Sequence, residues 1–284
     1  MPIDALINQQ NPDGGWPYLR GTSWTEPTVY AVMALLAAGQ GQAASRGFAW
    51  LAATQRADGG WAPQPGVGQS TWVTGLVALL PVASLGETRH AAAIGWLMDT
   101  VGRESTLAYR VREFLLGNSL PPEQQFAGWP WVPGAAAWVG PTSVAMLALE
   151  KERRRNPSAS IERRLAAGRH FLLDRMCGGG GWNHGSARPL GYDSDPYPET
   201  TGLALAALRG VRSPKIDLSI EVARGFLSEC RSTDALNWLR LGLIAHGHLS
   251  PDFRPPADLA CRTTCEGSLQ LLLEHTGGAG FFWA

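Results

Sequence analysis

The chain has 284 residues, with 24 Lys plus Arg and 24 Asp plus Glu, so its formal net charge is zero. That length suffices for one large domain with a substantial core, and the balanced charge lacks the basic footprint of a nucleic-acid-binding protein. No stretch reaches the roughly 18 uncharged apolar residues of a membrane span, and residues 1–11 lack the pattern of a secretory signal. Four irregularly spaced cysteines favour a reduced, cytoplasmic protein.

Several of the 12 tryptophans close a motif that repeats along the chain. In its fullest copy, a predicted helix carrying a small residue, an aromatic and a leucine ends at Gln55, and a Gly-rich turn then leads to Gly59 and Trp61. The other copies, in chain order, end at Trp16, Trp129 and Trp182. Glycine supplies the positive-φ conformations of such turns. We expect each Trp to pack back on its hairpin while the Gln side chain bonds to the turn.

A second helix is predicted after each turn, and these second helices carry small residues in register. The aligned positions are Ala31, Gly75, Ala145 and Ala204, each with an Ala three residues on and a Leu one further. Residues spaced by three and four share one helix face. The second helices are nearly uncharged, as buried helices are, whereas the first helices carry Arg and Glu. The pattern therefore predicts an inner ring of second helices inside an outer ring of first helices.

The rest of the chain adds further predicted helices. An extra helix is expected over 106–116, before a loop rich in Pro, Gly and Trp. Two weaker hairpins pair 218–229 with 238–246 and 258–261 with 265–274. No useful β-type alternation occurs. Five or six hairpins suffice to close a ring, so we expect an all-α fold, an α/α toroid, as a single domain over 1–284.

The spacing over 46–61, Arg-Gly-x-x-Trp-Leu-x-x-x-Gln-x-x-x-Gly-x-Trp, resembles the QW motif of squalene–hopene and oxidosqualene cyclases. The resemblance implies the (α/α) barrel that those cyclases share with the β subunits of protein prenyltransferases. Those cyclases carry two such domains, and this chain has room for one. Fold alone does not imply chemistry, so function has to be argued from the residues at the cavity.

The starts of the inner helices are expected to surround one mouth of a central cavity. The position five before each aligned small residue holds Glu26, Ser70, Gly140 and Glu199. Protonating cyclases carry a DxDD motif at such a helix start. That motif is absent here, but Glu199 falls near the slot of the acid, and Asp193 and Asp195 lie just upstream. The catalytic candidates are therefore Glu199, Asp195, Asp193 and Glu26. The alternative is that these carboxylates only stabilise helix starts through the helix dipole.

Aromatic residues in or beside the inner-helix starts are candidates for binding a substrate. They are Trp24, Tyr30, Trp72, Trp131, Trp138 and Tyr197. Aromatic faces stabilise cations and also pack in cores, and either use suits a cavity for an apolar ligand.

The leading hypothesis is a terpenoid-cyclase-like protein that acts on or binds a hydrophobic isoprenoid. Two alternatives stay open: a non-catalytic toroid that binds a lipid or a protein partner, and a zinc-dependent prenyltransferase-like enzyme. For zinc, the nearest approaches are Asp258 with Cys261, and Cys261 with Cys265, whose spacing shares a helix face. Buried Cys is more often a small hydrophobe, so no metal site and no cofactor is predicted. Peripheral contact with a membrane also stays open.

Overall fold

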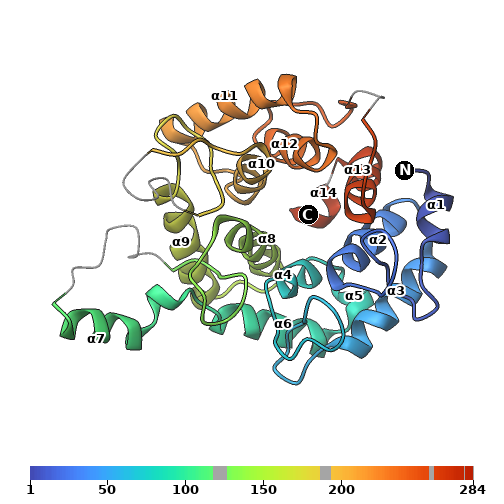
Figure 1. Cartoon of the computed structure of the whole chain (residues 1–284), viewed down its shortest axis with the longest axis horizontal. Coiled ribbons are helices and arrows are strands. Elements are labelled where there is room, and N and C mark those ends of the chain that lie inside the picture. The colour runs from blue at the N-terminus through green and yellow to red at the C-terminus, as the bar shows by residue number, and fades with distance from the viewer. Residues whose placement is uncertain (118–126, 186–192, 256–258, 278, 284) are drawn as a thin grey trace.

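The computed structural model of the chain describes residues 1–117, 127–185, 193–255, 259–277 and 279–283. Within those ranges every regular element is a helix, and strand-like pairing is limited to two isolated bridges. The helices form two concentric rings (Figure 1), so the predicted α/α toroid is confirmed.

Six helices of the described chain form the inner ring. They are α2 (Thr25–Ala37), α4 (Val73–Ala78), α8 (Val139–Arg155), α10 (Pro198–Ala207), α12 (Thr233–Ala245) and α13 (Thr264–Thr276). Each contacts the next in this order, and α13 closes the ring against α2 (Figure 1). Their residues are buried on almost every side, as their lack of charge predicted.

Five helices of the described chain form the outer ring: α1 (Ile3–Asn8), α3 (Gly41–Thr54), α6 (Glu87–Asp99), α9 (Ala159–Asp174) and α11 (Pro214–Glu229). Each buries one stripe; in α9 this stripe includes Ile161, Leu165, Gly168 and Leu172 at helical spacing. Short α5 (Val82–Leu85), η1 (Arg103–Ser105), α7 (Leu107–Leu115) and α14 (Ala279–Phe282) complete the chain.

The helix expected over 106–116 is confirmed as α7, and the pair over 218–246 as α11 and α12, although α12 begins at Thr233 rather than Trp238. The outer helix expected at 258–261 was wrong where the structure describes it, since Leu259–Cys261 is not helical. Asp258 lies outside the described residues.

The tryptophan of each repeat joins its two helices, as predicted. The indole N–H groups of Trp16, Trp61, Trp129 and Trp182 donate to the carbonyls of Leu6, Leu51, Leu97 and Leu172 at 2.6–2.8 Å. Their backbone N–H groups donate to the hydroxyls of Thr28, Thr74, Thr142 and Thr201 on the inner helices, at 2.9–3.0 Å. Every one of these indoles is buried, so each bond forms in a dry environment where an unmade bond is costly.

The predicted bond from Gln to the turn is also confirmed. Gln10 and Gln55 donate to the carbonyls of Gly14 and Gly59 at 2.8 and 2.9 Å. Each Gln also donates to a carbonyl of the next outer helix, at 3.0 Å. The side chain therefore links one hairpin to the next around the ring.

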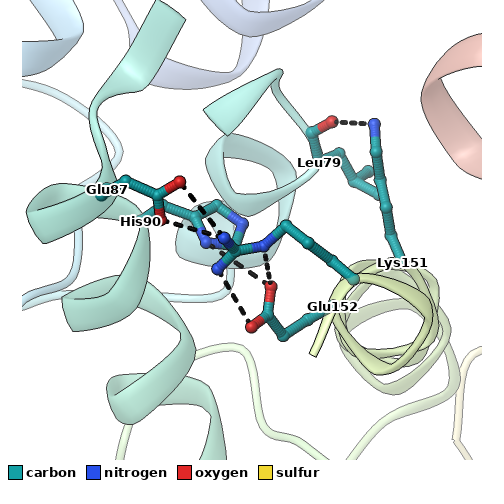
Figure 2. Close-up of polar contacts among 6 residues, drawn as sticks. Leu79, Glu87, His90, Lys151 and Glu152 are labelled. Atoms are coloured by element: carbon teal, nitrogen blue, oxygen red, sulfur yellow. Dashed lines mark hydrogen bonds and ion pairs between the residues drawn. The ribbon is translucent and has the colours of Figure 1, made fainter. Parts of the chain in front are cut away.

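The inner helices begin at one mouth of the ring and end at the other. At the mouth where they end, polar side chains join the elements (Figure 2). Lys151 of α8 donates to the carbonyl of Leu79 at 2.9 Å, and the buried Glu152 lies 3.8 Å from Nδ1 of His90 on α6. Helix α14 lies inside the ring (Figure 1).

Candidate active site

A cavity of about 330 Å³, here called the site cavity, lies at the mouth where the inner helices begin. Its lining residues are Glu26, Tyr30, Trp72, Trp131, Gly140, Val144, His184, Glu199, Thr200, Leu203, Asp234 and Trp238. Aromatic and aliphatic side chains make up most of this wall, and the carboxyl groups stand among them.

The carboxyl groups reach the site cavity from equivalent places. Glu26, Glu199 and Asp234 are each the second residue of an inner helix, namely α2, α10 and α12. Gly140 holds the same place on α8 and Cys265 on α13. In a ring of helices that begin at one mouth, the second residues converge, so the repeat itself brings three carboxyl groups together.

Glu26 is held as a weak acid. Burial is the largest cause and raises its pKa to about 7, and the charge of Asp234 acts in the same direction. Tyr18 donates a hydrogen bond to Glu26 Oε2, which opposes part of that rise. Burial and the Glu26 charge in turn raise the pKa of Tyr18 far above its ordinary value, so Tyr18 remains a donor.

Asp234 behaves in the same way. Burial raises its pKa to about 6, helped by the charges of Glu266 and Glu199, and a hydrogen bond with Trp238 opposes the rise. Burial and the charges of Glu26 and Asp234 also raise the pKa of the Cys265 thiol. Near neutral pH, therefore, Glu26 and Asp234 each include a protonated fraction.

Glu199 lies nearer the solvent, with its side chain 34% exposed. Its Oε1 lies 3.5 Å from Nε2 of His184. The His184 ring in turn packs against Tyr197, with ring centroids 5.1 Å apart. This group forms the rim of the site cavity.

Aromatic rings form two walls of the site cavity. Trp72 and Trp131 meet edge to face, with centroids 4.9 Å apart and planes at 86°. Tyr30 and Trp238 meet in the same manner at 6.3 Å. Such faces carry negative potential and attract a cation. A cation formed inside the cavity would therefore be stabilised by rings as well as by carboxylates.

The structure brings some of the sequence candidates together and leaves others outside. Glu26, Glu199, Tyr30, Trp72 and Trp131 line the site cavity.

The remaining candidates do not line it. Asp193 and Asp195 are exposed. Trp24 packs against Tyr18, with centroids 5.4 Å apart. Trp138 is 38% exposed and Tyr197 48% exposed.

Sequence reasoning missed Asp234 and Trp238. The expected start of α12 at Trp238 left Asp234 outside the helix. Ser232, which caps α12 by accepting a bond from the N–H of Ala235, was an available signal, because Ser followed by Asp in the first turn is typical of a helix start.

The described ranges contain neither a cluster of metal-ligating side chains nor a helix that could cross a bilayer. There, no three or more His, Cys, Asp or Glu side chains are grouped so as to hold a metal ion. The Cys261 thiol donates to Gln270 Oε1 at 3.0 Å. In the same ranges no helix combines the length and apolar character needed to cross a bilayer.

The chain matches no protein-family model and no curated protein sequence. Solved structures of similar fold include the endo-β-1,4-glucanase CMCax of Acetobacter xylinum, with TM-score 0.59, 12% identity and coverage of 98% of this chain and 99% of that one. A family GH8 endo-β-1,4-glucanase from an Achatina fulica gut metagenomic library gives TM-score 0.57, 15% identity and 95% coverage of each chain. The type II terpene cyclase MstE of Scytonema gives TM-score 0.55, 19% identity and coverage of 96% and 78%. At such identities these likenesses show the α/α toroid fold, which hosts different chemistries.

Proposed function

We propose that the protein is a terpenoid-cyclase-like enzyme that binds a hydrophobic isoprenoid in the site cavity and protonates it with a carboxylic acid. The observation that carries this proposal is the meeting of three carboxyl groups with four large aromatic rings around one small hollow. A neutral carboxyl donates a proton, and the rings stabilise the cation that results.

Glu26 is the proposed proton donor. Protonation of an alkene needs an undissociated acid in a dry place, and burial with a pKa of about 7 supports that role for Glu26. Tyr18 holds the carboxyl in position through its hydrogen bond. Glu199, which the sequence pattern singled out first, and Asp234 are proposed to stabilise the cation through their charge.

The proposed reaction is an isomerisation. The proton adds to one carbon of an alkene, and the other carbon becomes a cation. A second alkene of the same ligand attacks that cation and closes a ring. A carboxylate then accepts a proton lost from the ligand, so the product has the composition of the substrate.

Incubation in D₂O with geraniol or farnesol, followed by mass spectrometry, tests the proposal. We expect a cyclised isomer that carries one deuterium from solvent. Glu26→Gln should lower turnover by about a hundredfold or more, in line with the contribution of general acids. Glu221→Gln, an exposed change on α11, is the matched control and should leave turnover intact.

Three results would contradict the proposal. Unchanged turnover in Glu26→Gln would remove Glu26 as the donor. Binding of isoprenols without any cyclised product would favour the non-catalytic toroid. Release of reducing sugar from carboxymethylcellulose, with no action on isoprenols, would favour polysaccharide chemistry like that named for the glucanase neighbours.

A further inference from the structure

A second hollow, of about 520 Å³, lies at the mouth where the inner helices end. Its apolar wall includes Leu147 of α8, Ala206 of α10 and Phe282 of α14, together with Val211, which follows α10 in the chain. Arginine and glutamate side chains from α8 and α9 line it as well. Nothing in the proposed reaction uses this hollow.

The second hollow and the site cavity share two inner helices, and outer helix α9 also lines the second hollow. On α8, Val144 lines the site cavity and Leu147 the second hollow. On α10, Leu203 lines the site cavity and Ala206 lines the second hollow. Residues three apart share a helix face and differ in height by about 4.5 Å. The two hollows therefore follow one another along one wall of the ring, less than a helical turn apart.

Phe282 lines one hollow and contacts a residue that lines the other. Its side chain is fully buried and lines the second hollow. Its ring meets the edge of Trp238 at a centroid distance of 5.9 Å, and Trp238 lines the site cavity. Figure 1 shows the helix that carries Phe282, α14, inside the ring of inner helices.

Contacts that do not involve the Phe282 side chain fix α14 in this place. Lys151 donates to the carbonyl of Phe281 at 3.2 Å and also to that of Leu79, the bond drawn in Figure 2. Arg154 donates to the carbonyl of Trp283, and the guanidinium of Arg209 lies 5.5 Å from the Trp283 ring centroid. Since these bonds mostly hold backbone, a change of the side chain at Phe282 alone leaves the anchors of α14 in place.

We propose that Phe282 is the partition that sets the length of the ligand. Its ring divides one channel through the toroid into two hollows, so the site cavity accepts a short apolar chain and excludes a longer one. That the chain is an isoprenoid rests on the proposed function. The partition itself rests on the placement of Phe282 and applies to any apolar chain.

The test compares wild type, Phe282→Ala and the milder Phe282→Leu with Val211→Ala, which enlarges the second hollow and leaves the partition intact. Dissociation constants are measured by calorimetry for geraniol, farnesol and geranylgeraniol, and for unbranched alcohols of matched length. Circular dichroism and thermal melting identify the variants that remain folded. We expect the ratio of long-chain to short-chain affinity to rise by about tenfold or more in Phe282→Ala, because the added carbons leave water for the second hollow. The ratio should rise less in Phe282→Leu, and in Val211→Ala it should equal the wild-type ratio.

The outcomes separate the two proposals. An equal ratio in wild type and in a folded Phe282 variant overturns the partition, even if every isoprenol binds. A rise in the ratio for unbranched alcohols, with no isoprenol bound, supports the partition and contradicts the proposed function. The same rise in Val211→Ala, or no binding of either alcohol series by any variant, also overturns the partition.

Discussion

Glu26 and Asp234 illustrate two opposing effects on one side chain. Each lies in the first turn of an inner helix, where the helix dipole stabilises a carboxylate by about 0.3–1 kcal/mol. Each is also half-buried among apolar walls, and the loss of solvation destabilises the carboxylate. Burial is the largest cause of the raised pKa at both residues, and it favours the neutral carboxyl. The carboxyls are therefore more than helix caps.

The pH dependence of stability tests this balance at Glu26. Its pKa rises from 4.5 when unfolded to about 7 when folded, so the folded state binds the proton more tightly. Protonation of Glu26 therefore contributes to the stability of the folded state. This contribution is complete below the unfolded pKa and is lost as the pH rises through the folded pKa. Glu26→Gln keeps a neutral side chain, and we expect it to be more stable than wild type by about 1–2 kcal/mol above neutral pH.

Urea denaturation on both sides of neutrality measures this difference. Glu221→Gln, exposed on α11, should reproduce the wild-type dependence. If Glu26→Gln kept the wild-type fall in stability with pH, Glu26 would not be the group that titrates.

Thr71 and Thr74 lie one turn apart and differ in the hydrogen bonds of their side-chain hydroxyls. Thr74 accepts a bond from the buried N–H of Trp61, whereas no partner of the buried Thr71 hydroxyl is found in the described part of the chain. Thr74→Val should lower the free energy of unfolding by about 1–3 kcal/mol, because it leaves the Trp61 N–H unpaired.

Thr71→Val is the matched change and should be neutral or slightly stabilising. Denaturation of both variants measures the contrast. Equal losses would mean that the hydroxyl at Thr74 contributes volume rather than a bond.

At the scale of the helix, α10 and α12 pack closely through their glycines. A Cβ on Gly202 would lie 2.3 Å from the backbone carbonyl carbon of Trp238. Because backbone cannot move aside as a side chain can, Gly202→Ala should destabilise the protein by about 1–3 kcal/mol or more. It should also disturb Trp238 and thus the site cavity.

Gly225 on α11 provides the control, since nothing lies within 4 Å of a Cβ placed there. Gly225→Ala should stabilise by up to about 1 kcal/mol through helix propensity. Thermal melting of the two variants checks both signs, and a neutral Gly202→Ala would contradict the close packing.

The same helices show what the sequence predicts well. The register of Ala31, Gly75, Ala145 and Ala204 predicted which helices form the inner ring, because burial on all sides demands small, uncharged residues in every copy. Helix α12 lacks a strong copy of the turn motif before it. The prediction therefore placed its start too late and missed Asp234. The local sequence pattern therefore predicts the bounds of a helix correctly where the repeat motif is complete, and wrongly where the motif is incomplete.

At the scale of the whole molecule, the site depends on closure of the ring. Glu26 and Asp234 are over 200 positions apart in the chain and influence one another only because α13 packs on α2. The insertion of Phe282 behind Trp238 is equally non-local. Neither follows from spacing or composition, since both arise from the way the last helices meet the first.

Closure also depends on hydrogen bonds between successive hairpins. In most of these the donor lies on the earlier hairpin, but in one it lies on the later hairpin. Gln10 and Gln55 donate forward to the carbonyls of Ala43 and Arg89 on the next outer helix. In the described part of the third hairpin, no Gln makes such a link. Instead Arg164, which holds on α9 the place that Ala43 holds on α3, donates back to that hairpin's turn.

Arg164 donates to the carbonyls of Thr100, Ala127 and Gly128 at 2.9, 2.9 and 3.2 Å, and its guanidinium lies 3.2 Å from the Trp129 ring centroid. Burial lowers its pKa to about 9, which still leaves it charged at neutral pH. Arg164→Met keeps the apolar stem but removes every donor, so we expect a loss of about 2–4 kcal/mol.

Arg163→Met, an exposed change one residue away, should alter stability by less than about 0.5 kcal/mol. Hydrogen exchange should show faster opening of α6 and of the turn before Trp129 in Arg164→Met, while α11 and α12 keep their protection. Uniform loss of protection around the ring would instead mean that the toroid unfolds as one unit and that this link has no local role.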